Sequence, residues 1–143
     1  MKILFVCTGG ICRSPMAEII FENLAKAHKR TDIFVRSAGV DAQPSELTSD
    51  LALKALKECG EGAHKPFQST KFTPEMVKEF NYIFCMAACH KHRIDPQNIY
   101  KNVRVLTAND VRDPWGYGID VYKNVCKQLQ TALKELYDMI CRT

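Results

Sequence analysis

The sequence has no apolar run long enough to cross a membrane and only a slight imbalance of charge. Its longest uncharged apolar stretch, residues 3–7, is far shorter than the ~18 residues that a membrane span requires. It also lacks the length and the small-residue cleavage site of a secretion signal. The 20 basic residues barely outnumber the 16 acidic ones, which does not indicate a nucleic-acid partner but is compatible with a small anionic substrate. We therefore expect a protein that binds neither membranes nor nucleic acid.

Repeats, low-complexity segments and linkers are likewise missing, and the seven cysteines form no regular framework. Their odd number and scattered positions, in a chain long enough to bury a core without cross-links, indicate a reducing compartment and hence the cytoplasm. With 46% hydrophobic and 25% charged residues over 143 positions, the composition is that of a globular protein. The expected organisation is one domain, residues 1–143, present as a monomer.

Short apolar runs alternate along the chain with segments of helical periodicity. Strands are expected at residues 2–7, 33–37, 82–86 and 103–106, and the first is apolar nearly throughout, as in a strand buried on both faces. Helices are expected from about residues 15, 49 and 119, with a short one after Thr73 and Pro74. This order predicts a three-layer α/β fold, in which helices flank a twisted, parallel sheet of four strands in a Rossmann-like arrangement. Ligands bind such sheets beyond the carboxyl ends of the strands, so the loop after the first strand is the expected site.

That loop, residues 7–14 (CTGGICRS), has the composition of an anion-binding site. Gly9 and Gly10 allow successive backbone N–H groups to turn inward, and the following helix directs its positive end to the same point. The Arg13 guanidinium can bind two oxygens of one phosphate. In this field, with the Ser14 hydroxyl as a donor, Cys7 is expected to act as a thiolate nucleophile. The loop therefore predicts catalysis through a phosphocysteine.

Residues 113–118 (DPWGYG) follow the fourth strand and thus lie at the same edge of the sheet. Asp113 would protonate the leaving oxygen and then accept a proton from the water that hydrolyses the intermediate. Trp115 and Tyr117 would form aromatic walls for a phenyl ring. Taken alone, Cys7 could be an inert core residue, and an Asp-Pro pair followed by an aromatic residue is a common turn. The strand before the loop and the proline-led helix after it favour the catalytic interpretation.

Residues 6–18 (VCTGGICRSPMAE) resemble the signature of the low-molecular-weight protein tyrosine phosphatases at nearly every position. Residues 36–39 (RSAG), 62–65 (GAHK), 82–86 (YIFCM) and 113–115 (DPW) resemble the other landmarks of that family, in order. The resemblance implies a phosphotyrosine phosphatase I-like fold, with Cys7 as nucleophile, Arg13 as phosphate clamp and Asp113 as general acid and base.

The same resemblance implies roles for the residues around these three. The phosphate would be bound by the loop residues Thr8, Gly9, Gly10, Ile11, Cys12 and Ser14. Ser37 and His64 would support the loop, and neither a metal nor an organic cofactor is implied.

Three features depart from the family's pattern, and one of them is the lack, around Gln43 and Pro44, of the aromatic residue found in many relatives. Gly10 stands where the family usually has an Asn that braces the loop through the positions of Ser14, Ser37 and His64, which predicts a looser loop. Residues 115–118 (WGYG) resemble a bacterial subgroup that includes protein-arginine phosphatases, whose arginine-specific members carry Thr at the position of Ile11. The apolar side chain of Ile11 suits a phenyl ring better than a guanidinium, so it favours phosphotyrosine as a substrate.

Several other cysteines and histidines admit more than one interpretation. Cys12 is either a redox partner that protects Cys7 as a disulfide, as the resemblance implies, or a buried core thiol. Residues 85–92 (CMAACHKH) could suggest zinc, but the pattern favours a core cysteine beside solvated histidines. Thioredoxin-coupled arsenate reductases share this fold and loop and use two later cysteines, but Cys89 follows Cys85 too closely for their usual spacing.

The function expected from the sequence is hydrolysis of phosphotyrosine in proteins, with inhibition by phosphate-like oxyanions. The alternative enzymes are a protein-arginine phosphatase and an arsenate reductase. The non-enzymatic alternative is an inactive phosphate-binding module. The presence of both Cys7 and Asp113 argues against that module, because a protein that only binds phosphate needs neither residue.

Overall fold

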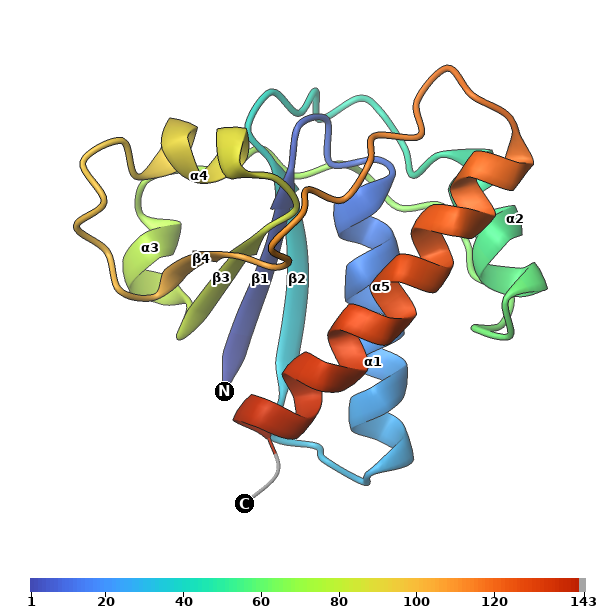
Figure 1. Ribbon diagram of the computed structural model, residues 1–143, viewed down its shortest axis with the longest axis horizontal. Helices are drawn as coiled ribbons and strands as arrows, with labels where there is room; N and C mark the ends of the chain where they lie inside the picture. The colour runs from blue at the N-terminus through green and yellow to red at the C-terminus, as the bar shows by residue number, and fades with distance from the viewer. Residues whose placement is uncertain (142–143) are drawn as a thin grey trace.

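The computed structural model describes residues 1–141 and contains one sheet of four strands (Figure 1). The strands are β1 (Lys2–Cys7), β2 (Phe34–Gly39), β3 (Tyr82–Cys85) and β4 (Val103–Val105), in the spatial order β2-β1-β3-β4. All of their pairings are parallel. The structure confirms the predicted α/β fold with a parallel sheet of four strands.

Helices cover both faces of this sheet, which gives the three layers expected. On one face lie α1 (Arg13–Ala27), α2 (Asp50–Glu58) and α5 (Ile119–Ile140), and on the other lie α3 (Met76–Glu79) and α4 (Ala88–Ile94) (Figure 1). The sequence did not predict α4, because its seven residues, ACHKHRI, carry no apolar stripe.

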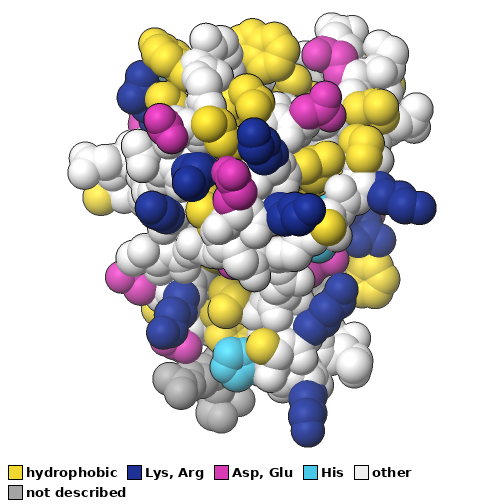
Figure 2. Space-filling model, turned by 90° about the vertical axis from the view of Figure 1, so that its right-hand side faces the viewer, with side chains coloured by type: hydrophobic (Ala, Val, Ile, Leu, Met, Phe, Trp, Pro, Cys, Tyr) yellow, Lys and Arg dark blue, Asp and Glu magenta, His cyan; other side chains and the backbone are white. Residues whose placement is uncertain are grey.

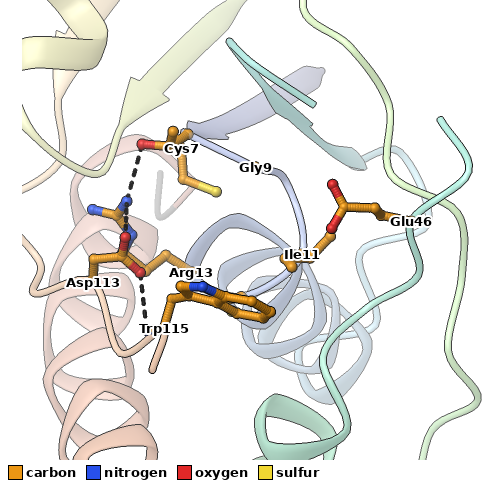
Figure 3. Close-up of a pocket in the computed structure, with 9 residues that line it drawn as sticks. Cys7, Gly9, Ile11, Arg13, Glu46, Asp113 and Trp115 are labelled. Atoms are coloured by element: carbon orange, nitrogen blue, oxygen red, sulfur yellow. Dashed lines mark hydrogen bonds and ion pairs between the residues drawn. The ribbon is translucent and has the colours of Figure 1, made fainter. Parts of the chain in front are cut away.

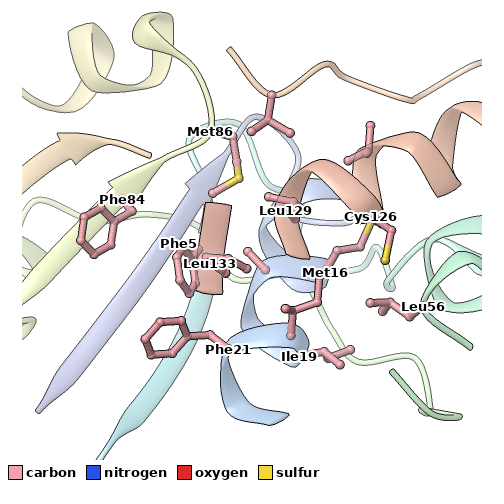
Figure 4. Close-up of a cluster of buried hydrophobic side chains, with 14 of the residues drawn as sticks. Phe5, Met16, Ile19, Phe21, Leu56, Phe84, Met86, Cys126, Leu129 and Leu133 are labelled. Carbon is pink, nitrogen blue, oxygen red and sulfur yellow. The ribbon is translucent and has the colours of Figure 1, made fainter. Parts of the chain in front are cut away.

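The core lies on both sides of β1. Its side chains alternate between the two faces, so Phe5 packs in the cluster formed with α1, α2 and α5, whereas Val6 packs in the cluster on the opposite face. Figure 4 shows the larger cluster, in which the ring centroids of Phe5 and Phe21 of α1 lie 5.9 Å apart. Burial on both faces makes β1 a rigid support for the loop at its carboxyl end.

The helix after this loop begins slightly earlier than predicted. Pro15, expected as the first helical residue, is the third residue of α1, which starts at Arg13. The missing N–H of Pro15 costs nothing in the first turn, and the Met16 N–H closes that turn on the Cys12 carbonyl at 3.1 Å. The loop of residues 8–12 therefore passes directly into the helix.

The last helix has the apolar stripe that the sequence predicts. Of the predicted stripe residues, Tyr122, Val125, Leu129, Leu133 and Leu136 are buried and Ile140 is partly buried. On the face seen in Figure 2, basic and acidic side chains are interspersed, as in a solvated surface. No helix among residues 1–141 is long and apolar enough to span a bilayer.

The order of the strands determines where a ligand can bind. The chain pairs β2 with one edge of β1 and then crosses to pair β3 with the other edge, so the topology switches direction at β1. The loops on either side diverge at that point and leave a crevice beyond the end of β1.

Candidate active site

A pocket of about 270 Å³ opens at the carboxyl end of β1 (Figure 3). It is lined by Cys7, Thr8, Gly9, Ile11, Cys12, Arg13, Glu46, Asp113 and Trp115. All of these except Glu46 were singled out in the sequence. Gly10 and Ser14, also expected to bind phosphate, are buried and are not among these lining residues.

The Cys7 thiol has a hydroxyl partner suited to a change in its charge. Cys7 Sγ lies 3.0 Å from Ser14 Oγ, which in turn lies 3.3 Å from the carbonyl oxygen of Ala38. When Cys7 is a thiol, it can donate to Ser14 while Ser14 donates to Ala38. When Cys7 is a thiolate, the Ser14 hydroxyl can turn and donate to the sulfur. The buried pair therefore stabilises the nucleophilic form without moving a heavy atom.

The Arg13 side chain is almost fully buried, and three contacts hold its guanidinium in place. Its Nη1 donates to the Val111 carbonyl at 3.1 Å, and its Nη2 donates to Thr8 Oγ1 at 3.3 Å. The same Nη2 lies 3.7 Å from a carboxylate oxygen of Asp113. These contacts orient the guanidinium before any ligand binds, as a phosphate clamp requires.

A buried histidine supports Thr8 from the opposite face of the sheet. His90 of α4 accepts a hydrogen bond from the Ala87 N–H at Nδ1 (3.1 Å), so its Nε2 carries the proton and donates to Thr8 Oγ1 at 2.8 Å. Burial, and next the positive charge of Arg13, lower the pKa of His90 to about 4. The prediction of a solvated histidine was wrong for His90, which is 2% exposed. No sequence signal marks it, because its helix has no apolar stripe.

Asp113 and Trp115 form the outer side of the pocket. The backbone N–H of Trp115 donates to a carboxylate oxygen of Asp113 at 3.1 Å, which holds both residues in one turn (Figure 3). Tyr117, expected as a second wall, lies outside the pocket, and its ring packs on the Arg112 guanidinium with 4.5 Å between the ring centroid and Cζ. Gly116, with φ = +86°, separates the two aromatic residues and turns the chain between them.

The residues expected to support the loop make other contacts. His64 is exposed, and its Nε2 contacts the Glu61 carbonyl at 2.8 Å, away from the loop. Ser37 is buried, and its hydroxyl lies near the Glu18 carboxylate, where it opposes the burial that raises the pKa of Glu18 to about 7. A residue that the sequence did not indicate, Ser69, instead donates to the Gly9 carbonyl at 2.7 Å.

Cys12 lies in the same loop as Cys7 but faces a phenol. Its Sγ lies 3.4 Å from the Tyr122 hydroxyl, and burial raises the pKa of the Cys12 thiol. Both cysteines are free thiols here, so the protective disulfide stays a prediction. Cys85 is a core residue, as one interpretation held, and burial raises its pKa to about 12.

The arrangement provides the groups for phosphoryl transfer to a thiolate. A sulfur lies at the floor of the pocket, an oriented guanidinium beside it, and a carboxylate at the rim where a leaving group would depart. Within residues 1–141, no group of three or more His, Cys, Asp or Glu side chains is placed to hold a metal ion.

Comparison with known proteins assigns the chain to a family. A family model described as low molecular weight phosphotyrosine protein phosphatase matches residues 2–143. The chain is 35% identical to the protein-arginine-phosphatase of Bacillus subtilis (strain 168), with 95% of this chain and 94% of the relative covered. It is 30% identical to the low molecular weight protein-tyrosine-phosphatase PtpB of Staphylococcus aureus, with 99% and 100% covered.

A solved structure agrees with these sequence relatives. The YwlE arginine phosphatase, in a mutant with a phosphorylated active-site serine, matches the fold with a TM-score of 0.89 at 33% identity, over 99% of this chain and 97% of that one. The pocket described above and the match across nearly the whole chain lead to one assignment. The chain belongs to the low molecular weight phosphotyrosine protein phosphatase family, and it is a hydrolase of that family.

Proposed function

We propose that this protein hydrolyses phosphotyrosine monoesters in proteins through a covalent phosphocysteine. The observation that carries the proposal is the convergence of Cys7, Arg13 and Asp113 on one pocket. A covalent intermediate is also supported by the YwlE mutant, in which the active-site serine is phosphorylated.

In the first step, the Cys7 thiolate attacks phosphorus while Arg13 and the loop amides bind the equatorial oxygens. The bond from phosphorus to the tyrosine oxygen breaks, and protonated Asp113 donates its proton to that oxygen. In the second step, Asp113 takes a proton from water, which attacks phosphorus and displaces the Cys7 thiolate. Inorganic phosphate leaves, and both groups return to their starting states.

Turnover of para-nitrophenyl phosphate tests this assignment directly. Cys7→Ser should abolish turnover while the thermal midpoint stays close to that of the wild type, since serine fits the same site. Asp113→Asn should slow phenyl phosphate more than para-nitrophenyl phosphate, because the poorer leaving group depends more on protonation. Turnover by Cys7→Ser near the wild-type rate, or an equal loss for both esters in Asp113→Asn, would contradict the proposed roles.

Phosphoarginine is the second candidate substrate, and the 35% identical relative named as a protein-arginine-phosphatase favours it. We prefer phosphotyrosine because Ile11 and Trp115 offer apolar surface on two sides of the pocket. Two peptides of one sequence, phosphorylated on tyrosine or on arginine, should differ in kcat/KM in favour of phosphotyrosine. Ile11→Thr should reduce that ratio, whereas Leu47→Thr, at an exposed position outside the pocket, should leave it unchanged.

We further propose that the partners are phosphotyrosine-bearing proteins and that the enzyme acts as a monomer in the cytoplasm. The odd number of cysteines supports a reducing compartment. Vanadate and phosphate should inhibit competitively, because both present tetrahedral or trigonal oxygens to the same loop amides.

A further inference from the structure

The loop of the pocket is held by its backbone carbonyls. The Cys7 carbonyl accepts a hydrogen bond from the Val40 N–H at 2.9 Å. The Thr8 carbonyl accepts one from the Asp41 N–H at 2.8 Å. The Ile11 carbonyl accepts one from the Ser49 N–H at 2.8 Å. Each carbonyl is thus bonded to the surrounding frame. Because the C=O and N–H of one trans peptide point in opposite directions, this arrangement favours N–H groups that face the pocket.

The Gly9 carbonyl differs from these three because its partner is a side chain. The buried Ser69 hydroxyl donates to it at 2.7 Å, across sixty positions of sequence. The peptide that joins Gly9 to Gly10 is also the freest in the loop, since neither residue has a side chain to restrict rotation. One hydroxyl therefore determines the orientation of the peptide that is least restrained by its own sequence.

Ser69 is itself placed firmly. Its backbone N–H donates to the Glu46 carbonyl at 2.9 Å, and the next residue, Thr70, accepts from the Gly39 N–H at the end of β2 at 2.9 Å. These bonds do not involve the Ser69 side chain, so its replacement leaves the surrounding backbone anchored.

The Ser69 hydroxyl also fills the space beside Gly10. Gly10 has φ = +69°, and a Cβ added there would lie 2.6 Å from Ser69 Oγ and 3.1 Å from the Gly39 backbone nitrogen. A side chain at position 10 and the hydroxyl at position 69 thus compete for one volume. The Ser69 hydroxyl therefore occupies the space that a side chain at position 10 would take, and it supports the loop from a separate segment of the chain.

From these contacts we infer that Ser69 is a positioning residue for phosphoryl transfer: by holding the Gly9 carbonyl, it presets the Gly10 N–H for the oxyanion. The inference rests on the proposed function of the pocket. It assigns the task of bracing the loop to a segment between α2 and α3 that sequence motifs did not mark. Ser69 touches no reacting atom and acts through the Gly9–Gly10 peptide.

Ser69→Ala tests the inference, with Ser69→Thr as the variant that restores the hydroxyl. Loss of this one hydrogen bond should lower kcat for para-nitrophenyl phosphate about 3- to 10-fold and raise the inhibition constant of vanadate by a similar factor. Ser69→Thr should recover most of both values. Ser45→Ala, an exposed serine on the neighbouring loop, is the matched control and should change neither. Wild-type kcat and vanadate affinity in Ser69→Ala would overturn the inference.

Binding of vanadate, measured by calorimetry, keeps this test separate from that of the enzymatic function. If the wild type binds vanadate but does not turn over, the proposed function fails, and weaker binding by Ser69→Ala still supports the positioning role. If Ser69→Ala does not fold, Ser69→Cys replaces it, because the Cys side chain has a similar shape but is a weaker hydrogen-bond donor. Ser69→Cys should lower kcat and the vanadate affinity, by smaller factors than those expected for Ser69→Ala. An unchanged vanadate affinity in Ser69→Cys would then overturn the inference.

A coupled variant tests the shared volume. Gly10→Ala should be less harmful in the Ser69→Ala background than in the wild type, because the atom 2.6 Å from the new Cβ is gone. If the fold-loss in kcat of the double variant equals the product of the fold-losses of the two single variants, the two positions act independently, which would contradict the inference.

Discussion

The contact between His90 and Thr8 can be dissected with two substitutions that each keep half of it. The Oδ1 of an Asn occupies nearly the place of His Nδ1, counted in bonds from Cβ, and the Nε2 of a Gln occupies nearly the place of His Nε2. His90→Asn therefore keeps an acceptor for the Ala87 N–H but loses the donor to Thr8. His90→Gln keeps the donor to Thr8 and loses the acceptor.

The two variants should separate activity from stability. In His90→Asn, Thr8 loses the hydrogen bond from His90 and keeps only the 3.3 Å contact from Arg13. The Arg13 guanidinium is then supported by a Thr8 side chain that has one hydrogen bond fewer. That bond is worth about 0.5–1.5 kcal/mol, so kcat/KM for para-nitrophenyl phosphate should fall about 3- to 10-fold. In His90→Gln the buried Ala87 N–H is unsatisfied, which should lower the free energy of unfolding by about 1–3 kcal/mol while kcat/KM stays within about twofold.

Steady-state rates and urea unfolding would be measured on both variants and on His92→Asn, an exposed histidine of the same helix. A fall in kcat/KM for His90→Gln as large as for His90→Asn would refute the role of the Thr8 contact. So would wild-type activity in His90→Asn.

The pH dependence of stability gives an independent check on His90. Its pKa is about 4 in the folded protein, below the value of 6.5 for a free histidine, because burial and Arg13 disfavour the cation. Between pH 6.5 and pH 4 the His90 imidazole is protonated in the unfolded chain but stays neutral in the folded protein. The contribution of His90 to the free energy of unfolding is therefore complete above pH 6.5 and is lost as the pH falls toward 4. His90→Asn should lack this component, and its unfolding free energy should fall less steeply over that range. An equal slope in both proteins would show that His90 is not buried as a neutral ring.

Two further substitutions probe the edges of the pocket. A Cβ at Gly39 would lie 2.5 Å from the Gly10 nitrogen and 2.6 Å from the Thr8 carbonyl oxygen, so Gly39→Ala must displace the backbone. We expect the free energy of unfolding, measured in urea, to fall by about 1–3 kcal/mol and the activity to fall by more than about tenfold. Normal activity in a folded Gly39→Ala protein would show that the loop tolerates the shift. Glu46 lines the pocket with no ion-pair partner among residues 1–141, so its charge should repel a phosphate dianion. Glu46→Gln should lower KM about twofold at low salt and have no effect at high salt, and a change independent of salt would contradict this electrostatic origin.

Local patterns in the sequence were sufficient to predict the architecture. The apolar run of β1, the alternation of strands and helices, and the stripe of α5 follow from the periodicity of side chains, which depends on near neighbours. The pocket followed too, because in a parallel sheet the loop after β1 and the turn at Asp113 must meet at one edge. The position of Cys7, Arg13 and Asp113 in one pocket was therefore predictable without coordinates.

The supports of the pocket were not predictable in this way. Ser69 and His90 reach the loop from segments some sixty to eighty positions away, and a serine or a histidine in an unpatterned segment carries no local mark of its partner. Glu46, which lines the pocket, was likewise not marked by any local pattern. His64 was assigned to the loop and lies elsewhere, because the path of the chain between α2 and β3 decides which side chain arrives there. Periodicity and motif spacing specify which elements form and at which edge they end. Which distant hydroxyl or imidazole completes a hydrogen bond depends on ångström-scale packing between elements, and that exists only in the folded chain.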